Sequence, residues 1–578
     1  MDLQKKNTCF WLLCTLCILS LFMFLGSTWF HTRGEPREAV VAFSMIDKGN
    51  WVLPVNSGVD MAYKPPFFHW CIAVVASVVG SVNEYTSRMP SALALSAMVL
   101  VGFVFYARRR NAETAFLAAL ITLTNFEVHR AGVACRVDMV LTAAMVIALF
   151  QLYKWGERGL KGVPLTGVLA LSAAALTKGP VGIVLPCVVT AVFLWIRGMR
   201  FMKIFFSFLA VALLSCILPA LWYYAAWLQG GEQFYGLVYE ENVLRFLGKM
   251  SYESHINPAY YNVVTVVAGY VPYTLLLLVS LFFLHYGKPT GKPLLWWKRF
   301  KEYIRKMDDV RLFSLLSIVI IFVFYCIPKS KRSVYLLPIY PFIAYFLAEY
   351  ILYLRRRHLK SLQIFGSIMA GVALLLTLVF GAVRTGCVPD AWFSSGRHAA
   401  QNLAYLHALR DTPLSFFDLV IVLLPVVAAF LYFRLQHRRG QGNGIIYACI
   451  GVIFSIFFAL DGLYQPLILN VKSDKAVAGQ IEKLVPEGTL YGYHSNNPKG
   501  NPMRHFTVNF YLGDRIVPFE DFMPEKGFLF MGEDQYDVFM SFYGRDYVLE
   551  DVYNSGHVSC DDRRVNHLYR FRKTEGTN

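Results

Sequence analysis

Ionisable side chains gather in the short polar segments that separate the long apolar runs of this sequence. We single out Glu35 and Asp138, because a carboxylate at the edge of an apolar run can act as a general base toward an acceptor hydroxyl or amine. Cations in the same segments could hold a phosphate and stabilise the charge that develops as it leaves. The pattern indicates a two-part site. Its candidate substrate-binding residues are Arg37, Lys64, Arg136, Lys178, Glu241, Arg245, Lys329 and Lys331.

Each of these residues also has an ordinary structural explanation. Glu35 could be a solvated loop carboxylate, and Asp138 could cap the helix that follows it. The lysines could extend their ammonium groups to lipid headgroups. Glu241 could pair with Arg245, which lies four residues later on the same helix. The argument for function is therefore collective: all of these side chains fall on one side of the predicted membrane.

The composition is that of a membrane protein. Of the 578 residues, 56% are hydrophobic and 16% are charged, and the mean hydropathy is +0.45, whereas a soluble domain needs more surface charge. The run from Cys9 to Phe30 is long enough to cross the bilayer and is followed by no small-residue cleavage pattern, so we expect an uncleaved first span. The net charge of +17 does not indicate a nucleic-acid partner, because the basic residues lie in clusters between apolar runs.

The order of these clusters predicts a topology with about thirteen transmembrane helices. Lys5 and Lys6 place the N-terminus inside, and Arg108–Arg110 should be inside too. An odd number of crossings must then separate them, so the apolar run 65–82 is expected to lie along the outer interface, and the C-terminus is outside. The expected spans are 9–30, 88–107, 113–128, 136–153, 164–178, 180–196, 203–228, 258–284, 310–327, 333–353, 361–383, 414–434 and 444–464.

The composition changes after the last span, which divides the chain into a membrane domain (1–464) and an outer α/β domain (465–578). Charge rises, and short β-prone runs alternate with helical patterns. A further helix is expected at the interface over Glu38 to Lys48. A disulfide between Cys387 and Cys560 is possible on the outer side but is not predicted. Strands are expected at Leu490–His494, Arg515–Phe519 and Gly527–Met531, and helices near 474–484 and 533–543.

Several short motifs, in order along residues 9–350, resemble those of the membrane glycosyltransferases with the C-type fold. This group contains the aminoarabinose transferases of lipid A and the protein O-mannosyltransferases. The matching motifs are Glu35-Pro36-Arg37, Asp47-Lys48-Gly49-Asn50-Trp51, Tyr63-Lys64-Pro65-Pro66, His69-Trp70, Arg88-Met89-Pro90-Ser91-Ala92, Arg136-Val137-Asp138, Thr177-Lys178-Gly179-Pro180 and Tyr335-Leu336-Leu337-Pro338.

The resemblance implies an all-α membrane domain with a cytoplasmic N-terminus and a polyprenyl-phosphate sugar as donor. It implies that Lys64, Lys178 and Arg245 contact the lipid phosphate, and that Arg37 and Asp138 shape the acceptor and donor site. Tyr335 joins the substrate-binding candidates through its motif.

The sequence departs from the family pattern at two places. The family usually has an Asp-Glu pair where this chain has Gly34-Glu35, so either Glu35 takes the role of the missing Asp or Asp138 carries more of it. Our hypothesis is that both are needed, with Glu35 nearer the acceptor. Aminoarabinose transferases can bind a metal through a Glu and a His, where this chain has Tyr63 and Asn242. The sequence therefore makes no cofactor certain: a divalent metal ion is possible, but its family ligands are not matched.

The leading hypothesis is thus an enzyme of the bacterial inner membrane that transfers a sugar from a polyprenyl phosphate to lipid A, a protein or another glycan. The C-terminal domain would lie in the periplasm. A lipid or glycan transporter is the alternative, but it should carry ionisable residues near mid-membrane. A non-catalytic scaffold would leave the clustered outer cations unexplained.

Overall fold

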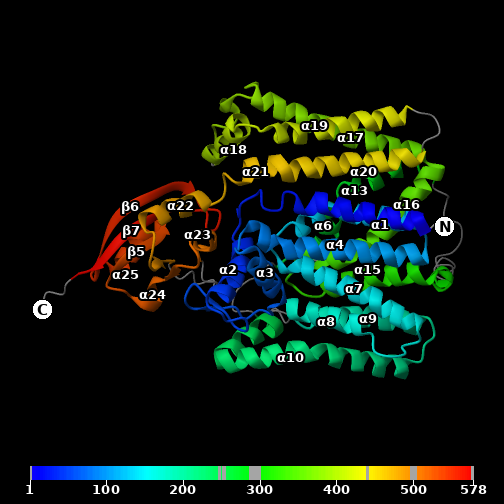
Figure 1. Cartoon of the computed structure of the whole chain (residues 1–578), viewed down its shortest axis with the longest axis horizontal. Helices are drawn as coiled ribbons and strands as arrows, with labels where there is room; N and C mark the ends of the chain where they lie inside the picture. The colour runs from blue at the N-terminus through cyan, green and yellow to red at the C-terminus, as the bar shows by residue number, and fades with distance from the viewer. Residues whose placement is uncertain are drawn as a thin grey trace.

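A computed structural model describes most of the chain (Figure 1). The helices of the membrane part run side by side, and a small sheet lies beyond one end of this bundle. The N-terminus lies at the opposite end of the bundle from the sheet. The described residues are 3–244, 249, 256–258, 260–285, 301–396, 398–437, 442–494 and 504–574.

Nine helical segments in these ranges are long and apolar enough to cross a membrane. They confirm the all-α, multi-pass fold class, because each apolar run closes its backbone hydrogen bonds internally, as a bilayer requires. The nine segments are α1 with the π-helical turn after it (Lys5–Phe22), α4 (Glu84–Arg109), α7 (Val137–Glu157), α10 with its π-helical end η2 (Phe201–Leu244), α15 (Asp309–Cys326), η3 with α16 (Ser333–Arg357), α17 (Leu359–Arg384), α19 (Phe416–Gln436), and α20 with η5 and α21 (Gly444–Leu469).

The count of thirteen spans is not confirmed, although each expected span coincides with helical structure. One is a pair, α12 (Tyr261–Gly269) and α13 (Tyr273–Leu281), bent by 97° at the break between them. Three others are too short, because 12 to 16 residues at 1.5 Å each reach less than the roughly 30 Å hydrocarbon core. These three are α5 (Ala112–Leu123), α8 (Leu165–Lys178) and α9 (Val181–Ile196).

The segment between the first span and α4 folds into a compact layer beside the bundle (Figure 1). Its main helix, α2 (Gly34–Asp47), begins four residues before the interfacial helix that the sequence predicts, and most of its residues are buried. The apolar run 65–82 forms α3 (Phe67–Val79), whose 13 residues are again too few to span the bilayer. Between them lies a short hairpin of β1 (Val55–Asn56) and β2 (Asp60–Met61).

The C-terminal part is a five-stranded sheet in the order β4-β3-β5-β7-β6. The three expected strands are present, with β3 parallel to both β4 and β5. The sequence analysis missed β6 and β7, which complete the sheet as an antiparallel pair. Cys387 and Cys560 are both free thiols. The strands are β3 (Leu490–Gly492), β4 (Ile516–Pro518), β5 (Lys526–Gly532), β6 (Tyr547–Val558) and β7 (Val565–Lys573).

Short helices complete the chain. Those of the C-terminal part cover the sheet, and their apolar side chains share cores with its strands. These helices are α6 (Phe126–Gly132), α18 (Ala399–Asp411), α22 (Lys475–Leu484), α23 (Phe506–Tyr511), α24 (Phe519–Phe522) and α25 (Tyr536–Tyr543). The division of the chain into domains at residue 464 stays a prediction.

Asp514 fastens the C-terminal part to the first loop. Its side chain is 1% exposed, and it accepts hydrogen bonds from the Ser44 hydroxyl at 3.0 Å, the Ser57 backbone N–H at 2.7 Å and the Asn509 amide at 2.9 Å. Lys48 adds an ion pair at 3.0 Å. One buried carboxylate thus ties α2 and the β1–β2 turn to the segment after α23.

Replacing Asp514 with Ala is expected to loosen this contact. It leaves buried donors without an acceptor, and a hydrogen bond to a charged group contributes about 1.5–3 kcal/mol. We expect a lower melting temperature for the purified protein and faster proteolytic release of the C-terminal part. Asp521→Ala, at an exposed carboxylate of α24, is the matched control. Equal melting and proteolysis of the two variants would contradict this role.

Candidate active site

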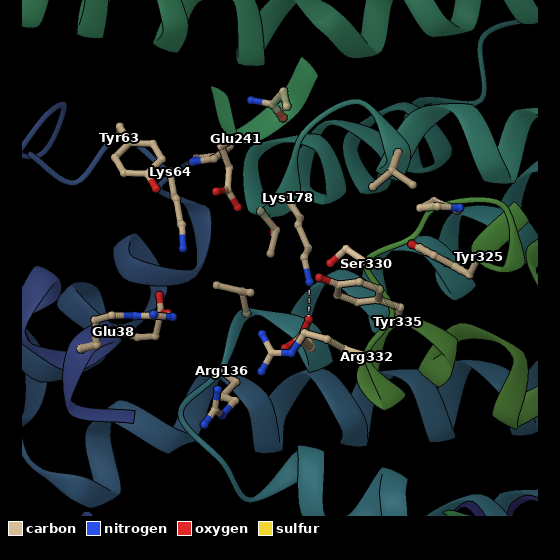
Figure 2. Close-up of a pocket in the computed structure, with 18 of the residues that line it drawn as sticks. Glu38, Tyr63, Lys64, Arg136, Lys178, Glu241, Tyr325, Ser330, Arg332 and Tyr335 are labelled. Carbon is tan, nitrogen blue, oxygen red and sulfur yellow. Dashed lines mark hydrogen bonds and ion pairs between the residues drawn. The ribbon is translucent and has the colours of Figure 1, made fainter. Parts of the chain in front are cut away.

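A cavity opens where the first loop meets the helix ends of the membrane part (Figure 2). Side chains reach it from α2, from the segment before α3, from the start of α7 and from the end of α8. The opposite wall comes from η2, the end of α15 and η3. Its lining residues are Arg37, Glu38, Tyr63, Lys64, Pro65, Arg136, Val137, Asp138, Thr177, Lys178, Val181, Glu241, Asn242, Phe324, Tyr325, Pro328, Ser330, Arg332 and Tyr335.

Asp138 and Lys178 both line this cavity and form an ion pair with each other. Arg136 has an extended backbone conformation that starts α7, which places Asp138 in the first helical turn. Lys178 is the last residue of α8, and Gly179, with φ of +81°, turns the chain into α9. The ammonium group of Lys178 also lies 4.4 Å from the centre of the Tyr335 ring. Two helix ends therefore present one anion and one cation at the same point.

The cavity has an excess of positive charge. Five cationic side chains line it but only three carboxylates, so the formal excess is two positive charges. Low-dielectric walls strengthen such a field and attract anions. A lipid phosphate is an anion of matching charge. The cations are Arg37, Lys64, Arg136, Lys178 and Arg332, and the carboxylates are Glu38, Asp138 and Glu241.

Glu38 is a site carboxylate that the sequence analysis missed. Its carboxylate accepts hydrogen bonds from Arg37 and His69, each at 2.9 Å. Burial alone would raise the pKa of Glu38, but the Arg37 guanidinium and the bond to His69 hold this pKa well below its usual range. Glu38 itself raises the pKa of Arg37. The available signal was that Glu38 directly follows Arg37 and that His69 belongs to a family motif.

Glu35 lies away from this cavity, against a second one. Its carboxylate accepts two hydrogen bonds from the Arg88 guanidinium, at 2.8 and 3.0 Å, and one from the Cys135 N–H at 2.8 Å. Burial would raise the pKa of Glu35, but these partners lower it to about 2. The hypothesis that Glu35 is the base stays a prediction, and this arrangement does not favour it, because all its partners stabilise the charged form.

The structure separates the other candidates. Tyr335 and Glu241 line the cavity, whereas Arg245 lies outside the described residues. Lys331 does not line it, because its buried ammonium group donates to the carbonyls of Asn257 and Pro328 at 3.2 and 2.8 Å. Lys329 does not line it either; the cation that this loop contributes is Arg332.

Comparisons with known proteins give a consistent result. Residues 63–223 match the family model of the dolichyl-phosphate-mannose-protein mannosyltransferases. An undecaprenyl phosphate-alpha-4-amino-4-deoxy-L-arabinose arabinosyl transferase of Proteus mirabilis is 26% identical over 380 residues, which cover 64% of each chain. The fold is similar to a crystal structure of ArnT from Cupriavidus metallidurans bound to undecaprenyl phosphate, with a TM-score of 0.70, 21% identity and coverage of 96% and 97%.

The chain is a membrane glycosyltransferase of the C-type fold. The mannosyltransferase match ends at residue 223, so it contains Lys64, Asp138 and Lys178 but neither wall residue Glu241 nor Tyr335. The family match and the arabinosyl transferase relative favour the transferase hypothesis over the transporter and the scaffold.

The structure shows what lies beside Gly34, where the chain departs from the family pattern. A Cβ atom at Gly34 would overlap with the guanidinium group of Arg136. The guanidinium group of Arg136, which lines both cavities, thus occupies the place of the first side-chain atom of an aspartate at residue 34. An Asp at residue 34 would require the Arg136 side chain to move from its present position.

The second departure concerns the metal ion. Tyr63 and Asn242 both line the cavity, but a phenol and a carboxamide are poor replacements for a carboxylate and an imidazole as zinc ligands. In the described ranges, two groups of three metal-ligating side chains come close enough to share an ion, and both lie outside this cavity. The residues present therefore do not fit the metal site of the aminoarabinose transferases.

Proposed function

We propose that this glycosyltransferase moves a sugar from a polyprenyl phosphate to an acceptor at the outer face of a bacterial inner membrane. The observation that carries the proposal is the cationic cavity, with its Asp138–Lys178 pair, at the ends of apolar helices. A lipid phosphate at this depth keeps its tail in hydrocarbon and its head among the cations. The Cupriavidus metallidurans neighbour of similar fold is bound to undecaprenyl phosphate, which supports this class of donor.

In this proposal the donor phosphate lies between Lys64, Lys178 and Arg332. Lysines act as point charges toward phosphate, and an arginine can donate two parallel hydrogen bonds. Tyr335 keeps Lys178 in place through the contact of its ring with the ammonium group. Glu38 is a positioning residue, since it holds the Arg37 guanidinium at the cavity wall.

Asp138 is the proposed general base. When the donor phosphate draws Lys178 toward itself, the carboxylate of Asp138 loses its partner and faces the acceptor. The acceptor oxygen or nitrogen attacks the anomeric carbon, its proton passes to Asp138, and the bond between the sugar and the phosphate oxygen breaks. The polyprenyl phosphate leaves with the electron pair, and the cations stabilise the charge that develops on it.

The first test of this proposal concerns the phosphate contacts. Lys64→Ala and Lys178→Ala should each weaken the binding of undecaprenyl phosphate to the purified protein by about 10- to 150-fold, because a hydrogen bond to a charged group contributes about 1.5–3 kcal/mol. Tryptophan fluorescence or calorimetry measures the affinity. Lys161→Ala, at an exposed lysine before α8, is the control. Parent-like affinity in both cavity variants would remove these lysines from the donor site.

A second test separates the two carboxylates. Mass spectrometry of lipids and surface glycans, with and without the protein, first identifies the transferred sugar. Asp138→Asn should then bind undecaprenyl phosphate at least as tightly as the parent but transfer sugar about 10²- to 10⁴-fold more slowly. Glu35→Gln should lower the melting temperature and keep a near-normal rate per folded molecule. The reverse pattern, a slow Glu35→Gln and a fast Asp138→Asn, would make Glu35 the base.

A third test concerns topology. We propose that the end of the bundle carrying the sheet faces the periplasm, because the cavity, which is open at that end of α7 and α8, must meet acceptors there. With the exposed Cys216 and Cys387 replaced by Ser, an impermeant maleimide should label Lys526→Cys in spheroplasts. It should label Arg158→Cys, beyond the far end of α7, only after permeabilisation. Labelling of Arg158→Cys in intact spheroplasts would invert the orientation.

A further inference from the structure

Two histidines and an aspartate meet in the C-terminal part, away from the cavity described above. His494 follows β3, His505 precedes α23, and Asp562 lies between β6 and β7. One ligand atom from each residue lies within 4.8 Å of the other two. The rings of His494 and His505 are 4.2 Å apart between their centres. Three chain segments that are distant in sequence thus contribute one potential ligand each.

Several polar atoms of this cluster are buried without a hydrogen bond, and Nδ1 of His505 lies 3.9 Å from Oδ2 of Asp562. His505 is 2% exposed and the Asp562 side chain 1%. Nε2 of His505, both ring nitrogens of His494 and Oδ2 of Asp562 make no hydrogen bond. Buried polar atoms are normally paired, since leaving one unpaired costs about 1–3 kcal/mol. Three residues that lie this close together, each with a buried atom that lacks a hydrogen bond, indicate a missing partner.

One backbone contact orients the Asp562 side chain. Oδ1 of Asp562 accepts the Arg564 N–H at 3.1 Å, which leaves only Oδ2 for the cluster. In His505, Nδ1 lies 3.9 Å from Oδ2 of Asp562 and Nε2 has no hydrogen bond, so either ring nitrogen can serve as the ligand atom.

The neighbouring arginines do not supply the missing cation. Arg504 forms two hydrogen bonds to Asp60, at 2.8 and 3.0 Å. Arg564 pairs with Asp534 at 3.0 Å. Each guanidinium therefore has its own carboxylate, and the cluster keeps one buried negative charge beside two imidazoles.

We propose that His494, His505 and Asp562 bind a divalent transition-metal ion, most favourably zinc. Imidazole and carboxylate are ordinary zinc ligands, with Zn–N and Zn–O distances of about 2.0–2.2 Å. A tetrahedral ion of this size holds its ligand atoms about 3.3 Å apart, so small side-chain rotations would close the present spacing of up to 4.8 Å. Three protein ligands leave a fourth position for water.

A second group of potential ligands in the same part, formed by Asp474, Cys560 and Asp561, differs in its hydrogen bonds. Asp474 accepts hydrogen bonds from the Ser559 hydroxyl at 2.8 Å and the Cys560 N–H at 3.2 Å. Asp561 accepts from the N–H and the hydroxyl of Thr507, at 2.7 and 2.8 Å. These carboxylates already have donors, so they do not need a metal ion.

The position of the zinc site gives it a structural role. Arg504 precedes His505 and pairs with Asp60 of the first loop. The Asn509 amide, in the helix that His505 precedes, donates to the Ser57 hydroxyl at 3.3 Å. An ion that fixes His505 relative to the sheet therefore fixes the segment through which the sheet contacts the layer that carries Arg37 and Lys64.

The test uses the full-length protein in detergent, stripped of metal and then dialysed against buffered Zn²⁺. The parent should retain one zinc per chain, with the zinc content measured by elemental mass spectrometry. It should also melt at a higher temperature than its stripped form. His505→Ala, Asp562→Asn and the double variant should no longer retain one zinc per chain. Their affinity for zinc should fall by more than about 10- to 100-fold, which is the loss expected when only a residue that orients a ligand is removed. They should also lose the zinc-dependent rise in melting temperature.

Two further variants keep the result independent of folding defects. His567→Ala removes a histidine that pairs with Asp551 in the same sheet, and it should keep its zinc. His505→Cys should retain the ion, because a thiolate is itself a zinc ligand. Substoichiometric zinc in the parent, or a zinc-dependent melting shift that survives in the double variant, would overturn the proposal.

Discussion

The buried ion pair between Glu35 and Arg88 is the contact on which the arrangement of both cavities depends. Arg88, from α4, donates to Glu35 and also to the carbonyls of Leu25 and Thr28 at 2.9 and 2.6 Å. Glu35 in turn accepts the backbone N–H of Cys135. Two charges therefore join the end of the first span, α2, α4 and the approach to α7. Removing either partner would leave an uncompensated charge in the interior, which typically costs 3–5 kcal/mol.

Once α2 is fixed in this way, its side chains contact different parts of the molecule. Arg37 and Glu38 reach the active-site cavity, and Ser44 contacts Asp514 of the C-terminal part. Arg136 lies between the two cavities. The short helix thus links donor site and sheet without a long flexible connection, so a change in the docking of the C-terminal part would be transmitted to the cavity wall.

The site itself uses helix ends rather than loops alone. Asp138 is in the first turn of α7, where the helix dipole stabilises a negative charge, and Lys178 is at the end of α8, where it stabilises a positive one. The pair is satisfied before donor arrives, and a phosphate can replace the carboxylate as the partner of Lys178. The proposed chemistry needs this exchange, because it frees a base only when a donor is present.

The sequence by itself determined the class of protein, because apolar length and the position of basic clusters follow from the bilayer. It also placed Lys64, Arg136, Asp138 and Lys178 on one side of the membrane, since each flanks an apolar helix, and the structure brings all four to one cavity. Only the tertiary structure decided that Glu38 rather than Glu35 faces the cavity, and that Arg332 rather than Lys331 lines it. Neighbouring residues of one sign differ in function according to the rotation of their helix or loop and to partners far away in the chain. The same reason applies to β7, whose pairing with β5 no local pattern specifies, and to the His494, His505 and Asp562 cluster, which exists only where three distant segments meet.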